Sequence, residues 1–88
     1  MSYTIIYSKQ AQKDAKRLKK SHLKDKALVL IKILEDDPFH SGLGYEALTG
    51  SLKGCYSRRI TIQHRLVYEV FEEEKIVHVL RMWSHYGE

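Results

Sequence analysis

The chain has little of what builds disulfide frameworks, membrane spans or disordered segments: one cysteine, one proline and no long apolar run in 88 residues. A single cysteine, Cys55, excludes an internal disulfide and any metal site made of several thiolates. The longest apolar stretch, Ala27 to Leu34, is interrupted by Lys32 and falls well short of the roughly 20 residues that cross a membrane. The first seven residues lack the features of a secretory signal. We therefore expect a soluble, cytoplasmic protein with no membrane partner.

The composition is that of one ordinary globular domain spanning residues 1–88, with 43% hydrophobic and 30% charged residues. Fifteen Lys and Arg against eleven Asp and Glu give a formal net charge of +4. This balance favours a polyanionic partner such as RNA without requiring one.

The N-terminal residues predict a strand followed by a basic helix. Met1–Tyr7 is rich in residues that favour strands. Ser8 can cap a helix that begins near Lys9, and Gln10–Lys20 contains strong helix formers without proline or glycine. The basic residues of this helix are expected to face water or RNA backbone. They are Lys13, Lys16, Arg17, Lys19 and Lys20.

A second helical pattern begins at Ser21 or His22 and stops before Asp36. Its apolar residues recur at helical spacing: Leu23, Ala27, Leu30, Ile31 and Leu34. Three more apolar residues widen this surface: Leu28, Val29 and Ile33. We therefore expect the second helix to be the more deeply buried of the two.

The second half of the chain predicts a loop and three strands. Pro38–Gly54 contains four glycines and is expected to be a surface loop, with a short ordered piece around Tyr45–Leu48. Cys55–Ile60, Arg65–Phe71 and Ile76–Trp83 have strand patterns and pair in hairpin order. The fold class is thus α+β: a strand, a two-helix hairpin and a three- to four-stranded antiparallel sheet, with the helices on one face.

Three arginines lie on the central hairpin. Side chains alternate between the faces of a strand, so at most one of the neighbours Arg58 and Arg59 points toward the same face as Arg65. Guanidinium is planar, permanently charged and able to bind phosphate through two parallel hydrogen bonds. Arginines on a rigid sheet therefore favour an anionic ligand.

Cleavage of an RNA phosphodiester without a metal needs a base, cations around the phosphate and an acid. Glu46 could supply the base, Arg59 and Arg65 the cations, and His85 the acid. Tyr86 could stack on a base or orient the phosphate. The five histidines show no pair at recognised metal-ligand spacing, so we expect no metal and no cofactor.

Short motifs, most of them in the C-terminal half, match a known family. They are Pro38-Phe39, Gly42, Glu46, Leu48, Leu52, Gly54, Tyr56-Ser57-Arg58-Arg59-Ile60-Thr61, His64-Arg65-Leu66-Val67-Tyr68 and His85-Tyr86. With these motifs, nearly the whole chain resembles the YoeB/Txe toxins of the RelE superfamily.

The resemblance implies the toxin of a type II toxin–antitoxin system: an mRNA endoribonuclease that works in the ribosomal A site and is neutralised by a YefM/Axe-type antitoxin. Carried over residue by residue, it makes Glu46 the general base, Arg65 the phosphate-stabilising arginine and His85 the general acid. Tyr86 matches the terminal tyrosine of the family, and Arg59 a further basic contact.

Further RNA contacts are expected from Arg58 and from the first helix, which would touch ribosomal RNA. The helix residues are Lys13, Lys16, Arg17 and Lys20. Two alternatives stay open: a RelE/ParE-superfamily toxin without nuclease activity that binds a protein such as DNA gyrase, and an RNA-binding module without activity. Whether two copies associate as a homodimer also stays open.

Overall fold

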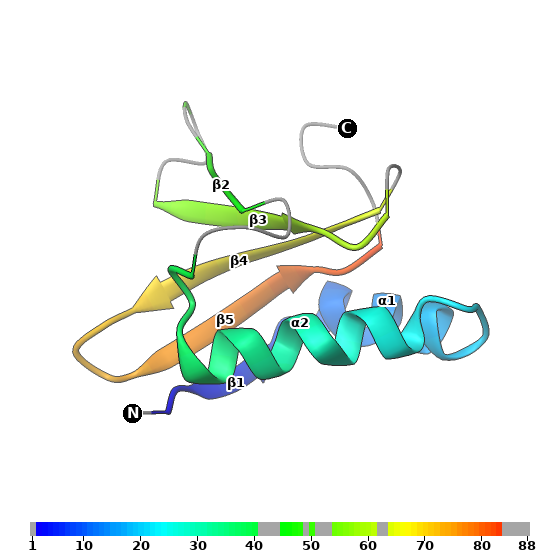
Figure 1. Ribbon diagram of the computed structural model, residues 1–88, viewed down its shortest axis with the longest axis horizontal. Helices are drawn as coiled ribbons and strands as arrows, with labels where there is room; N and C mark the ends of the chain where they lie inside the picture. Colours follow the sequence, from blue (N-terminus) through cyan, green and yellow to red (C-terminus); the bar gives the residue numbers. More distant parts are fainter. Residues whose placement is uncertain (1, 41–44, 49, 51–53, 62–63, 84–88) are drawn as a thin grey trace.

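The computed structural model describes residues 2–40, 45–48, 50, 54–61 and 64–83. In this part of the chain, two helices lie on the same side of a five-stranded sheet whose strand order is β1-β5-β4-β3-β2 (Figure 1). The elements are β1 (Thr4–Tyr7), α1 (Lys9–Lys19), α2 (Lys24–Asp36), β2 (Glu46–Ala47), β3 (Cys55–Arg59), β4 (Arg65–Phe71) and β5 (Ile76–Arg81).

The predicted α+β class is confirmed, and the strands that follow the helices pair antiparallel in chain order. The short ordered piece expected around Tyr45–Leu48 is the edge strand β2. The sequence did not reveal the partner of the first strand: β1 runs parallel to β5, from Thr4 opposite Ile76 to Tyr7 opposite Val79. Parallel neighbours need a long crossover, and the two helices lie within it.

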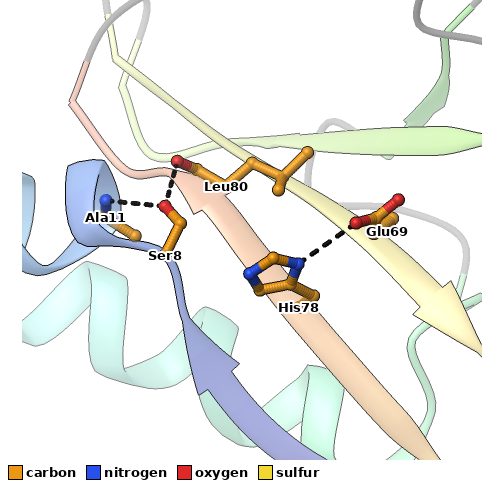
Figure 2. Close-up of polar contacts among 5 residues, drawn as sticks. All are labelled: Ser8, Ala11, Glu69, His78 and Leu80. Atoms are coloured by element: carbon orange, nitrogen blue, oxygen red, sulfur yellow. Dashed lines mark hydrogen bonds and ion pairs between the residues drawn. The ribbon is translucent and has the colours of Figure 1, made fainter.

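Ser8 links the start of α1 to the end of β5. Its Oγ accepts a hydrogen bond from the backbone N–H of Ala11 at 3.0 Å, which confirms the predicted N-cap. The same hydroxyl donates to the carbonyl oxygen of Leu80 at 2.8 Å (Figure 2). One side chain therefore fixes the direction in which α1 leaves the sheet.

Asp14 makes a second connection between α1 and the end of β5. Its carboxylate is buried and accepts from the backbone N–H of Met82 at 3.0 Å and from Nε2 of Gln10 at 2.9 Å. Sequence reasoning missed this residue. The available signal was its position on the apolar stripe of a basic helix, three residues after Ala11 and four before Leu18.

The main core lies between the helices and the sheet. Its fully buried members include Leu34 of α2, Leu66 and Tyr68 of β4, and Val79 of β5. The expectation that Leu28 and Val29 add to the buried surface of α2 is wrong, because they are 52% and 57% exposed. The buried residues of α2 already occupy one face of the helix, and the 100° step per residue places these two outside it.

Candidate active site

Three predicted site residues, one each from β2, β3 and β4, lie on the face of the sheet that the helices do not cover, here called the open face. Glu46 is paired with Ser57, and Ser57 with Val67, while Arg59 is paired with Arg65. Alternate residues of a strand share a face. The register therefore brings Glu46, Arg59 and Arg65 onto one surface.

Glu46 and Arg65 are in direct contact across this surface. Nη1 of Arg65 donates a hydrogen bond to Oε1 of Glu46 at 3.2 Å. The Glu46 side chain is 48% exposed and the Arg65 side chain 18% exposed. An ion pair this accessible to water is worth little for stability, and both of its groups can be reached by a ligand.

Arg59 adds a second cation beside Arg65. The two arginines are directly opposed on β3 and β4, and Arg59 is exposed to solvent. Like charges on opposed residues of neighbouring strands repel each other. A bound anion such as phosphate would relieve this repulsion, so the pair is suited to an anionic ligand.

Arg58 points to the other face and is fully buried. Its Nη2 donates to the carbonyl oxygen of Pro38 at 3.2 Å, and its guanidinium lies 4.9 Å from the ring centroid of Tyr45. Arg58 thus holds the segment after α2 against the sheet. This corrects the prediction that Arg58 contacts RNA, because its guanidinium is inside the protein; Arg59 is the neighbour that faces the open side.

Tyr68 also holds the segment after α2 against the sheet. Its hydroxyl donates to the carbonyl oxygen of Pro38 at 2.6 Å. Burial raises the pKa of Tyr68 to about 12, although the nearby Arg58 guanidinium opposes this rise. The phenol therefore keeps its proton, and with it the hydrogen bond, through the physiological range.

His85 and Tyr86, predicted as acid and terminal tyrosine, lie outside the described residues. The described chain ends at Trp83, whose ring makes an edge contact with that of His64, 4.4 Å between centroids. His64 immediately precedes Arg65. The described chain thus ends beside the part of the sheet that carries the two arginines.

His78 is not part of this cluster. It lies on β5, where its Nδ1 is 3.1 Å from Oε1 of Glu69 on the neighbouring strand (Figure 2). Its side chain is half-buried, at 29% exposed. Within the described ranges, no three His, Cys, Asp or Glu side chains are grouped closely enough to hold a metal ion.

The basic residues of α1 lie on the helix side, away from Glu46. The four predicted RNA contacts of this helix are all exposed: Lys13, Lys16, Arg17 and Lys20. Arg17 lies 6.0 Å from the ring centroid of Trp83. The structure therefore places the predicted RNA contacts on two separate surfaces.

A groove of about 300 Å³ runs between α1 and α2. Apolar side chains form most of its lining, among them Ala15, Leu18, Ala27, Leu28 and Ile31, and three exposed lysines, Lys16, Lys19 and Lys24, border it. An apolar groove bordered by positive charge is complementary to an amphipathic, acidic segment. Neither helix, nor any other described helix, is long and apolar enough to cross a membrane.

The chain is similar to known toxins in sequence and in structure. Residues 7–86 match the model of the YoeB-like toxin of bacterial type II toxin–antitoxin systems. A Toxin YoeB from Synechocystis is 40% identical over 67 residues, which cover 75% of this chain and 70% of the relative.

Two solved structures from Staphylococcus aureus share the fold. The YoeB dimer has a TM-score of 0.83 at 31% identity, covering 98% of this chain and 100% of the other. The heterotetrameric YoeB–YefM toxin–antitoxin complex has a TM-score of 0.80 with the same identity and coverage. This chain therefore belongs to the YoeB-like toxin family of bacterial type II toxin–antitoxin systems.

Proposed function

We propose that this toxin is a ribosome-dependent mRNA endoribonuclease that cleaves mRNA in the A site, without a metal, and so stops translation in the cytoplasm. The observation that supports this most directly is the contact of Glu46 with Arg65 on the open face, with Arg59 beside them. A carboxylate next to two guanidinium groups combines a base with the cations that a phosphodiester requires.

In the proposed reaction, Glu46 removes the proton of the ribose 2′-hydroxyl, and the resulting oxygen attacks the adjacent phosphorus. Arg65 and Arg59 stabilise the charge that develops on the phosphoryl oxygens. The bond from phosphorus to the 5′-oxygen breaks, and His85 donates a proton to that leaving oxygen. The products are a 2′,3′-cyclic phosphate and a free 5′-hydroxyl. Glu46 has taken up one proton and His85 has given one.

The roles of His85 and Tyr86 rest on the family resemblance. Trp83, the last residue that the structure describes before them, contacts His64, which immediately precedes Arg65. Tyr86 would stack on a nucleobase or orient the phosphate.

We further propose a YefM-type antitoxin as the protein partner. The groove between α1 and α2 suits an amphipathic segment whose acidic residues pair with Lys16, Lys19 and Lys24. A segment bound there would also cover part of the basic surface of α1 that we assign to ribosomal RNA. Association of two copies, as in the S. aureus YoeB dimer, is a further proposal.

Primer extension on a defined mRNA tests the nuclease, using purified protein with and without ribosomes stalled with an empty A site. We expect cuts at the A-site codon only when ribosomes are present. Absence of cuts in both conditions, from folded protein free of antitoxin, would contradict the proposal. A DNA gyrase supercoiling assay would then test the non-nuclease alternative.

A further inference from the structure

Ser57 has an unusual environment at the centre of β3. Its side chain is completely buried, and its hydroxyl has no hydrogen-bond partner among the described residues. Buried hydroxyls nearly always have a partner, because removing them from water without one costs free energy. Alanine would fit the same strand without this cost, so the hydroxyl calls for an explanation outside packing.

The position of Ser57 opposite Glu46 suggests an explanation for its buried hydroxyl. It is directly opposed to Glu46 on β2 and lies on the same face of the sheet. The Cβ atoms of directly opposed residues are about 4.5–5.5 Å apart, so a change of side-chain rotamer can bring a carboxylate to a serine hydroxyl. Among the described residues, the charged groups that face Glu46 from the neighbouring strands include Arg65 of β4, at 3.2 Å, and Arg59 of β3.

The proposed reaction makes two demands on Arg65. Before substrate binds, its guanidinium contacts Glu46. When the scissile phosphate binds, the guanidinium must turn toward the phosphoryl oxygens, and this weakens its contact with the Glu46 carboxylate. A donor on the neighbouring strand would then help to keep the carboxylate correctly directed.

We propose that Ser57 is that donor: its hydroxyl hydrogen-bonds to the Glu46 carboxylate when phosphate engages Arg65, and so positions the base for the 2′-hydroxyl. The inference rests on the proposed nuclease function. Ser57 acts through Glu46 and does not touch RNA, which makes it a positioning residue. A hydrogen bond donated to a carboxylate favours the charged form and keeps the base active at lower pH.

Ser57→Ala tests this by separating stability from activity. Thermal unfolding should show an unchanged or higher Tm, because the substitution removes a buried hydroxyl without a partner. Single-turnover cleavage on A-site-empty ribosomes should fall roughly tenfold or more, the effect of losing a hydrogen bond to a charged group. The acid limb of the rate–pH profile should move to higher pH, because Glu46 then accepts a proton more readily.

Two further variants provide controls. Cys55→Ala removes a buried side chain from the same strand and face, and its acid limb should match that of the wild type. Ser57→Thr keeps the hydroxyl, so its acid limb should also match, even where the added methyl group lowers Tm.

Each contrary outcome overturns the inference. Ser57→Ala with wild-type rate and acid limb would remove any role for the hydroxyl, and a lowered Tm with an unmoved acid limb would make Ser57 purely structural. Wild-type protein that does not cleave at all would overturn the nuclease proposal itself. Wild type that cleaves while Glu46→Ala does not, together with an unaffected Ser57→Ala, would overturn only the role of Ser57.

Discussion

Arg58 and Tyr68, on neighbouring strands, donate to the same acceptor, the carbonyl oxygen of Pro38, at 3.2 and 2.6 Å. A guanidinium and a phenol thus fix the chain at the point where it leaves α2. The loop that leads to Glu46 begins here, so the anchor also determines where the loop starts relative to the sheet.

Arg58 and Arg59 should respond to substitution in opposite ways. Arg58→Ala leaves a cavity and removes a donor to Pro38, and we expect the free energy of unfolding to fall by about 3 kcal/mol, as for other large buried side chains. Arg59→Ala should leave the free energy of unfolding within about 0.5 kcal/mol of the wild type, because the side chain is exposed. Its A-site cleavage rate should nevertheless fall. Urea denaturation measures the stability of both variants, and single-turnover cleavage measures their activity. An Arg58→Ala variant as stable as the wild type would contradict the role of Arg58 in holding Pro38.

The raised pKa of Tyr68 predicts a loss of stability in alkali. An unfolded tyrosine titrates near pH 10, whereas Tyr68 in the folded protein has a pKa of about 12. Tyr68 therefore holds its proton more tightly in the folded state than in the unfolded state. The resulting contribution to the free energy of unfolding is fully present below pH 10 and is lost as the pH rises to about 12.

The matched variant is Tyr68→Phe. At neutral pH it should be less stable by about 1 kcal/mol, the net value of a hydrogen bond. Between pH 10 and pH 12, the wild type should lose up to roughly 2 kcal/mol relative to Tyr68→Phe, because only the wild type has this phenol to ionise, so the variant should become the more stable of the two. Urea denaturation at a series of pH values measures both quantities. Parallel curves for the two proteins would contradict the assigned pKa.

Glu46→Ala and His85→Ala should each lower ribosome-dependent cleavage by roughly a hundredfold or more, the range typical of a general base or acid. Glu46→Ala should leave Tm nearly unchanged, because the ion pair with Arg65 is accessible to water. Ribosome binding, measured by co-sedimentation, should be retained in both variants. A double variant that cleaves at the wild-type rate would eliminate the proposed mechanism.

The groove between the helices can be tested with two neighbouring residues of α2. Leu28 lines the groove and Val29 does not, although both are exposed. The probe is a synthetic amphipathic helix with leucines along one face and glutamates on both flanks. Leu28→Glu should weaken its binding at least about tenfold, because a carboxylate then replaces apolar surface near the glutamates. Fluorescence anisotropy measures the affinity.

Val29→Glu adds the same charge to the same helix and should bind the peptide like the wild type. A control peptide with lysines in place of the glutamates should bind weakly to all three proteins. Equal binding of the two peptides, or equal loss in both variants, would argue against an acidic segment in the groove. A change of oligomeric state confined to Leu28→Glu would instead indicate that a second copy of the chain covers it.

Local features of this fold could be predicted from the sequence, whereas features that depend on distant pairing could not. The cap at Ser8 and the central hairpin follow from turn chemistry and side-chain periodicity within a few residues. The parallel pairing of β1 with β5 joins segments more than seventy residues apart, as the hydrogen bond from Ser8 to Leu80 shows. No local pattern specifies such a partner.

The candidate site shows the same division. Alternation along β3 predicts that Arg58 and Arg59 face opposite ways, but only the packing of Pro38 and Tyr45 determines which of them is buried. Family resemblance selects Glu46 and Arg65, while their contact depends on a two-residue edge strand that is too short to have a pattern of its own. The buried states of Asp14 and Ser57 likewise depend on neighbours from other elements.

The pairing of β1 with β5 has a consequence for the synthesis of the toxin. Residues made first cannot reach their place in the sheet until Ile76–Val79 have emerged from the ribosome that is making them. The nascent chain therefore cannot complete its sheet until β5 has been made, since long-range strand pairing forms only after the connecting chain is available. Both helices emerge before β5 does, and during that interval a partner that binds the helices can act before the sheet is complete.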